Sequence, residues 1–149
     1  MATVELAEQL ATERHYGQID KAGEPYIKHP ERVANAVNTP EEKMAAWMHD
    51  LIEDTDTTAD ELLKLGFPVA VVDAILSLTK RPGESRISAA HRTAANRIGV
   101  AVKLADVADN MNLDRLPQVT EKDLARLEEY KQVKLILEDA KVNRWNNFH

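Results

Sequence analysis

The stretch WMHDLIEDT at 47–55 places one imidazole and three carboxylates close together in the chain, namely those of His49, Asp50, Glu53 and Asp54. On an ideal α-helix, which turns about 100° per residue, these four side chains share one face. Carboxylates one turn apart repel each other, and the stretch contains no lysine or arginine to offset them. A bound divalent cation would relieve that repulsion. The alternative interpretation, a solvated face of an amphipathic helix, stays open from this stretch alone.

Two other segments carry further side chains that could bind a metal. His15 and His29 lie in HYGQIDKAGEPYIKHP, and Asp106, Asp109 and Asn110 lie in KLADVADNMN. Asp106 and Asn110 are four residues apart, so they point the same way on a helix. A mixed set of nitrogen and oxygen ligands suits Mn²⁺, Fe²⁺, Co²⁺ or Zn²⁺ better than Ca²⁺. The absence of cysteine disfavours a structural zinc site.

The elements that must position these residues are predicted to be helices, because no stretch alternates like a half-buried strand. Thr39, Pro40 and Glu42 form a helix start with a capping box, so a helix is predicted from there to about Asp54. The strongly apolar segment 69–79 predicts a central helix. Further helices are predicted at about 3–16, 58–66, 100–112 and from Thr120 onwards.

The C-terminal helix is predicted to carry a rough apolar stripe, consisting of Leu124, Leu127, Tyr130, Val133, Leu135 and Leu137. The longest loop signal is KRPGESR at 80–86, whose cations form either a solvated turn or a phosphate-binding loop. Together these signals predict an all-α bundle of six to eight helices. We expect one domain over 1–149, with a core over about 3–139 and a short polar tail over 140–149.

Composition limits the function classes. The net charge of −6 argues against broad nucleic-acid binding, and an anionic small substrate would need a local cationic pocket. No apolar run approaches the roughly 20 residues of a membrane span. The lack of cysteine fits a reducing compartment, and the N-terminus does not resemble a signal peptide, so we expect a cytoplasmic protein without a membrane partner. The sequence leaves the oligomeric state open.

The motifs GEPYIKHP, WMHDLIEDT and KLADVADN, in this order, resemble those of the HD superfamily of metal-dependent phosphohydrolases. Within it the chain is most similar to the small alarmone hydrolases and to the hydrolase domain of the bifunctional alarmone synthetase/hydrolases. The resemblance covers about residues 5–115 and implies an HD-type helical bundle. By position it implies four metal ligands, namely His29, His49, Asp50 and Asp106.

The resemblance also implies an activity, the removal of the 3′-pyrophosphate from ppGpp or pppGpp to give GDP or GTP. Glu53 and Asp54 correspond to the acidic pair that orients or deprotonates the attacking water, and Asn110 to a residue near the ribose or a phosphate. Lys21, in a loop, could reach a phosphate; the alternative is an ordinary solvated lysine. We expect Mn²⁺ as the cofactor, with another divalent transition metal as the alternative, and an anionic nucleotide as the binding partner.

The chain departs from the family pattern at Asp20, where the alarmone hydrolases carry an arginine that lies against the guanine base. An acid cannot replace a cation that stacks on a base. Two alternatives therefore stay open. The first is an HD phosphohydrolase for another nucleotide or phosphate ester. The second is a non-catalytic module that binds a nucleotide or a protein.

Overall fold

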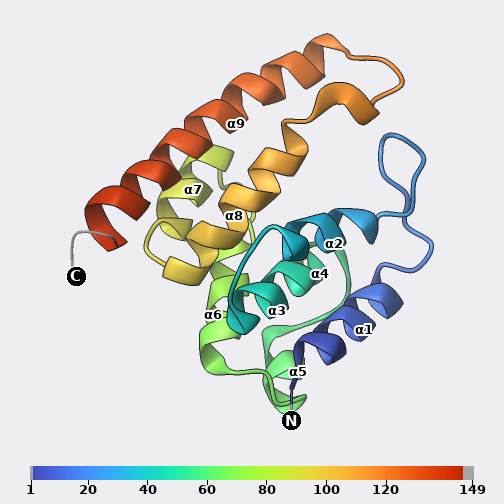
Figure 1. The fold of residues 1–149 in the computed structure, drawn as a ribbon, viewed down its shortest axis with the longest axis vertical. Coiled ribbons are helices and arrows are strands. Elements are labelled where there is room, and N and C mark those ends of the chain that lie inside the picture. Colours follow the sequence, from blue (N-terminus) through green and yellow to red (C-terminus); the bar gives the residue numbers. More distant parts are fainter. Residues whose placement is uncertain (1, 146–149) are drawn as a thin grey trace.

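The computed structural model describes residues 2–145, and nearly all of its regular structure is helical (Figure 1). Within these residues the only extended pairing is a single bridge between Ile19 and Pro25. The helices are α1 (Val4–Arg14), α2 (Lys28–Asn35), α3 (Pro40–Met48), α4 (Leu51–Asp54), α5 (Ala59–Lys64), α6 (Val69–Leu78), α7 (Arg86–Thr93), α8 (Arg97–Asn110) and α9 (Glu121–Ala140), with a 3₁₀ turn η1 (Leu113–Arg115) and a π turn η2 (Lys141–Trp145). Of the predicted polar tail, residues 146–149 lie outside the described part of the chain.

The helix predicted from Pro40 to Asp54 is interrupted, and the prediction is wrong in this respect. It ends at Met48 and resumes after Asp50, as α3 and α4. The cause is local: Nδ1 of His49 donates to the carbonyl of Ala46 at 2.6 Å, and in a continuous helix that carbonyl would accept from the Asp50 amide. With α3 and α4 counted as one interrupted helix, the described residues contain eight α-helices, within the predicted range.

The helices pack around two groups of buried apolar side chains. The larger group, here called the large core, is built from α1 to α6 and one side of α8; the smaller group, the small core, is built from α7, α8 and α9. The predicted central helix is α6, which buries Val71, Val72 and Ile75 in the large core. Helix α8 belongs to both groups, because Val102 lies in the large core and Val107 in the small core.

Close packing holds α8 against α6 at Gly99. A Cβ atom at position 99 would lie 2.4 Å from the Oγ of Ser77, so only glycine fits there without a shift of the neighbour. Helix α9 lies along α7 and α8 at the other end of the molecule from α1 and α5 (Figure 1). Among residues 2–145, no helix combines the length and the apolarity that a bilayer span requires.

Two helices and one stripe differ from the sequence prediction. Helices α2 and α7 were not predicted, because each is short and carries few apolar side chains. The predicted stripe of α9 is buried only in part: Val133 and Leu137 are fully buried, whereas Leu124 is 51% and Leu135 68% exposed. Helix α9 packs on one side only. Leu135, two residues after Val133, lies about 200° around the helix from it and therefore faces solvent.

Candidate active site

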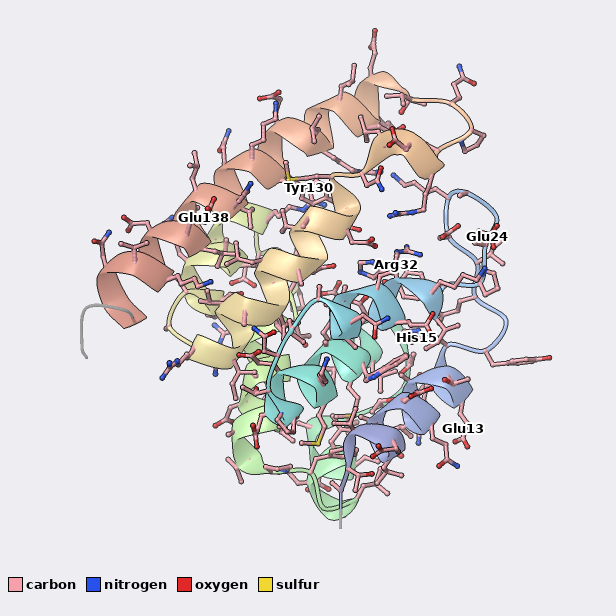
Figure 2. The ribbon with its side chains drawn as sticks, viewed as in Figure 1. Glu13, His15, Glu24, Arg32, Tyr130 and Glu138 are labelled. Atoms are coloured by element: carbon pink, nitrogen blue, oxygen red, sulfur yellow. The ribbon has the colours of Figure 1, made fainter. Side chains whose placement is uncertain are left out.

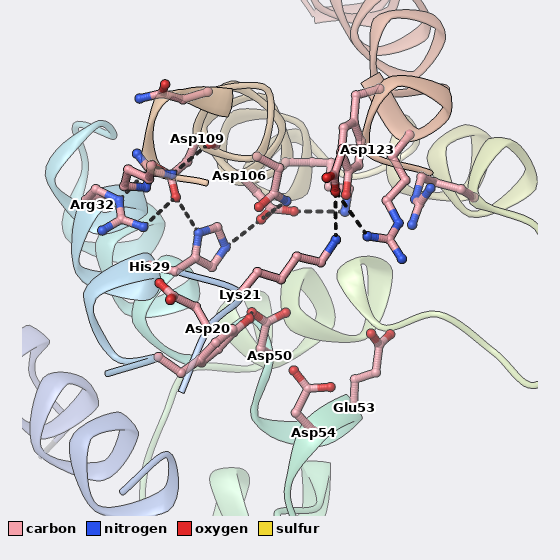
Figure 3. Close-up of a pocket in the computed structure, with 18 of the residues that line it drawn as sticks. Asp20, Lys21, His29, Arg32, Asp50, Glu53, Asp54, Asp106, Asp109 and Asp123 are labelled. Atoms are coloured by element: carbon pink, nitrogen blue, oxygen red, sulfur yellow. Dashed lines mark hydrogen bonds and ion pairs between the residues drawn. The ribbon is translucent and has the colours of Figure 1, made fainter. Parts of the chain in front are cut away.

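Three chain segments bring potential metal ligands together at the floor of a cleft. His29 comes from α2, His49 from the turn between α3 and α4, and Asp106 from α8; all three are buried, and one donor atom from each lies within 4.8 Å of the others. Nε2 of His29 lies 2.8 Å from Oδ1 of Asp106, and Nε2 of His49 lies 3.4 Å from the same oxygen. The structure thus places three of the four predicted ligands in one cluster, of which Figure 3 shows His29 and Asp106.

Asp50, the fourth predicted ligand, lies at the edge of this cluster. Its Oδ2 is 3.1 Å from Nε2 of His49 and accepts a hydrogen bond from the hydroxyl of Tyr26. The compact group of three does not include Asp50. Burial and the nearby Asp50 carboxylate raise the pKa of Tyr26, so that its hydroxyl stays a donor.

The donor chemistry of the cluster fits a divalent cation. Because Nδ1 of His49 donates to the carbonyl of Ala46, the neutral form of the ring has its lone pair on Nε2, which is buried and has no hydrogen-bond partner. Burial lowers the pKa of His49, but the carboxylates of Asp50 and Asp106 raise it overall, well above its ordinary value. These carboxylates therefore favour a positive charge beside Nε2, which a bound cation would supply. Two imidazole nitrogens and two carboxylates form the mixed set that suits a transition metal.

The two acids predicted to act on water lie on α4, next to this cluster. Glu53 and Asp54 are both exposed and both line the cleft. The amide of Lys80 donates to Oε1 of Glu53 at 2.7 Å. Burial, together with the negative charges of Asp50 and Glu53, raises the pKa of Asp54 to about 6. Asp54 is therefore better suited than an ordinary aspartate to accept a proton near neutral pH.

The cleft above the cluster has a volume of about 530 Å³ and is lined by side chains from helices of both cores, among them α2, α7, α8 and α9. Asn110 lines it and donates to Oδ1 of Asp106 at 3.2 Å; Lys21 lines it and lies 3.3 Å from Asp123 (Figure 3). The cleft is mixed in charge, with as many carboxylates as cations in its lining. Its cations are Lys21, Arg32, Lys80, Arg86, Lys103, Arg115 and Arg126, and its carboxylates are Asp20, Asp50, Glu53, Asp54, Asp106, Asp109 and Asp123.

Comparisons with known proteins point to one group of relatives, although no protein-family model matches. The guanosine-3′,5′-bis(diphosphate) 3′-pyrophosphohydrolase of Haemophilus influenzae is 36% identical over 116 residues, which are 68% of this chain and 17% of that protein. A protein of the same name from Aquifex aeolicus is 34% identical over 119 residues, 72% of this chain and 17% of that protein. The GTP pyrophosphokinase of Myxococcus xanthus is 34% identical over 131 residues, 76% of this chain and 17% of that protein.

A solved structure described as "A metazoan ortholog of SpoT hydrolyzes ppGpp and plays a role in starvation responses" covers 95% of both chains with a TM-score of 0.75 and 20% identity. This match shows that the two proteins share a fold. The chain is an HD-type homologue of the ppGpp pyrophosphohydrolases. The resemblance and the all-α fold predicted from the sequence are thereby confirmed. The chain spans only 17% of the length of the curated relatives named above.

In this homologue, two further residues contact the cluster and hold its side chains in place. Neither of them was given this role from the sequence. The carboxylate of Asp109 accepts from Nδ1 of His29 at 2.6 Å and from Arg32 at 2.7 Å. It thereby fixes the tautomer of His29 and leaves Nε2 for a metal. Nζ of Lys103 lies 2.9 Å from Oδ2 of Asp106. The spacing of three residues on one helix was the available signal in both cases.

The position of the missing family arginine has a structural function here. Oδ1 of Asp20 accepts hydrogen bonds from the amides of Ala22 and Glu24, both at 2.9 Å, and closes the loop before α2. On the opposite side of the cleft, the guanidinium of Arg86 lies 4.9 Å from the ring centre of Tyr130 and pairs with Glu129. Tyr130 lies on the side of α9 that faces α8 (Figure 2). The sequence placed Tyr130 in the apolar stripe of the C-terminal helix, and its side chain does pack against the small core as well as lining the cleft.

Proposed function

We propose that the chain is a Mn²⁺-dependent phosphohydrolase that removes the 3′-pyrophosphate of ppGpp or pppGpp, giving GDP or GTP and pyrophosphate. The observation that carries this proposal is the buried cluster of His29, His49 and Asp106 beneath a cleft whose lining includes seven lysines and arginines among as many carboxylates. Support comes from relatives named as pyrophosphohydrolases of guanosine-3′,5′-bis(diphosphate). The lack of cysteine supports a cytoplasmic, reducing environment.

Each proposed role follows from the position of the side chain. We assign His29, His49, Asp50 and Asp106 as the metal ligands, with Asp109 orienting His29. A metal bound there would lower the pKa of a water ligand and polarise a phosphate oxygen.

The remaining roles belong to side chains that line the cleft. Asp54, whose pKa is raised, takes a proton from the attacking water, and Glu53 orients that water. Lys21 binds a phosphate after leaving Asp123, and Asn110 contacts the ribose or a phosphate. These assignments make Asp54 rather than Glu53 the proton acceptor.

The test is release of pyrophosphate from ppGpp with and without Mn²⁺. We expect the reaction to require added metal, to vanish in Asp50→Ala and to fall strongly in Asp54→Asn. Asp73→Asn, an exposed carboxylate outside the cleft, is the matched control and should leave the rate unchanged. No pyrophosphate release at millimolar ppGpp would exclude this function. A chain that also binds no metal would favour the non-catalytic module.

A second candidate is the same chemistry on another nucleotide or phosphate ester. Asp20 favours this candidate, because it stands where the family has the arginine that meets guanine, and it provides no cation there. Its carboxylate instead accepts hydrogen bonds from two loop amides. A panel of pppGpp, (p)ppApp and deoxynucleoside triphosphates, assayed for phosphate and pyrophosphate with Mn²⁺, separates the two candidates. Preference for a substrate without guanine would support the second.

A further inference from the structure

The hydroxyl of Tyr26 contacts the proposed metal centre but has no role in the chemistry above. Tyr26 lies in the loop before α2, and its hydroxyl donates to Oδ2 of Asp50. Asp50 follows the point where α3 ends, so regular helix geometry does not fix its side chain. The same oxygen lies 3.1 Å from Nε2 of His49. A contact that holds this carboxylate therefore determines how its oxygens face a cation.

The position of Tyr26 is itself fixed from several sides. Its backbone amide donates to the carbonyl of Gln18 at 2.9 Å, which closes the loop. Its ring lies between two imidazoles, with ring centres 5.0 Å from His15 and 5.8 Å from His29. His15 is only 1% exposed, and its Nδ1 contacts Gln18 at 2.8 Å. The hydroxyl of Tyr26 is thus in position before any ligand binds, so binding does not have to order a mobile side chain.

We propose that Tyr26 is a positioning residue of the metal centre, whose hydroxyl holds Asp50 in the orientation that binds the cation. The inference rests on the proposed metal-dependent function, but it concerns affinity for the cation and not the choice of substrate. Hydrogen-bond partners of metal ligands typically contribute about 10–100-fold to metal affinity. Tyr26 acts through Asp50, so its removal weakens the binding of metal more than the chemistry at saturating metal.

The test uses Tyr26→Phe, which removes one oxygen and keeps the ring between His15 and His29. Titration calorimetry with Mn²⁺ alone should give a dissociation constant about 10–100-fold higher than that of the unmodified chain. The visible absorption of bound Co²⁺ should also change, because the geometry of its ligands changes. Tyr16→Phe is the matched control: Tyr16 is 90% exposed, and its loss of a hydroxyl should leave both readouts unchanged.

Activity then distinguishes positioning from contact with substrate. In Tyr26→Phe, excess Mn²⁺ should restore most of kcat with little change in KM. A raised KM at unchanged metal affinity would overturn the inference and make Tyr26 a substrate contact. Equal Mn²⁺ affinity of the Phe variant and the unmodified chain would also overturn it, while the proposed function stands. If the unmodified chain binds neither Mn²⁺ nor Co²⁺, the proposed function and this inference both fail.

Discussion

The two sides of the cleft are built differently. On one side α2, the turn at His49 and Asp50, and α8 present the metal-ligand candidates; we call this the metal wall. On the other side α7 and α9 present Arg86, Arg126 and Tyr130; we call this the α9 wall. Charged groups of the metal wall are largely buried and contact one another at 2.6–3.4 Å. Side chains of the α9 wall are partly exposed, and their ion pairs, such as Arg86 with Glu129 and Arg126 with Asp123, lie nearer to solvent.

This difference indicates a division of labour. A buried, mutually paired cluster is rigid, because moving one member leaves another charged group without its partner. Half-exposed cations are screened by solvent and can adjust their side chains at little cost. We therefore expect the metal wall to determine whether the reaction occurs and the α9 wall to determine which substrate binds.

The largest expected effect is on the metal wall. In Asp106→Asn the shared partner of His29, His49 and Lys103 loses its charge. Mn²⁺ affinity should fall by more than the roughly 100-fold that the loss of an outer partner costs, and pyrophosphate release should stop. Calorimetry and a pyrophosphate assay measure both. Asp114→Asn, an exposed carboxylate in η1, is the control. Metal binding retained in Asp106→Asn would place the cation elsewhere.

The second prediction concerns the buried side chains of the small core on which the α9 wall rests. Leu137 is fully buried in the small core, and Leu137→Ala should lower the free energy of unfolding by about 2–5 kcal/mol. Leu135, two residues away and 68% exposed, provides the matched variant Leu135→Ala, which should change stability by less than about 0.5 kcal/mol. Urea denaturation compares the two. Similar losses for both variants would mean that α9 does not pack as described.

The third prediction separates recognition from chemistry. Tyr130→Ala removes the ring under the Arg86 guanidinium and should raise KM about tenfold, the equivalent of about 1.4 kcal/mol. The affinity for Mn²⁺ should not change, since Tyr130 contacts no proposed ligand. Steady-state kinetics at saturating metal give KM and kcat. Arg97→Ala, an exposed change at the start of α8, is the control. A fall in kcat alone would contradict the division between the walls.

The smallest effect concerns the loop between α6 and α7, which leads into the α9 wall. Hydrogen bonds from Arg92 and from the Arg81 amide lower the pKa of Glu84 to about 2. Because the folded pKa lies below the ordinary value of 4.5, this contribution to stability is present above about pH 4.5 and is lost as the pH falls towards 2. Thermal melts at pH 3 and pH 6 should therefore differ less in Glu84→Gln. The exposed change Glu138→Gln should leave the difference as it is.

Much of the metal wall was predictable from the sequence, whereas the α9 wall was not. The motifs around His29, His49 and Asp106 identified the residues that the structure brings together, because the resemblance supplied contacts between distant segments. The break after Met48 was not predictable, since it depends on the His49 ring competing for a backbone carbonyl. The role of Asp109 could have been predicted from its spacing to Asp106 alone. The contact of Tyr130 with Arg86 could not, because it depends on α7, a helix whose sequence carries no clear apolar period.

The glycine at the start of α8 limits how this protein can be redesigned. Helix α8 supplies Asp106 to the metal cluster and Val107 to the small core that supports α9. A methyl group at position 99 would lie 2.4 Å from the Oγ of Ser77, so either that side chain or α8 would have to shift. A shift of α8 would change the width of the cleft and the geometry of the ligands together. Attempts to admit a bulkier substrate should therefore vary α9 and leave position 99 untouched.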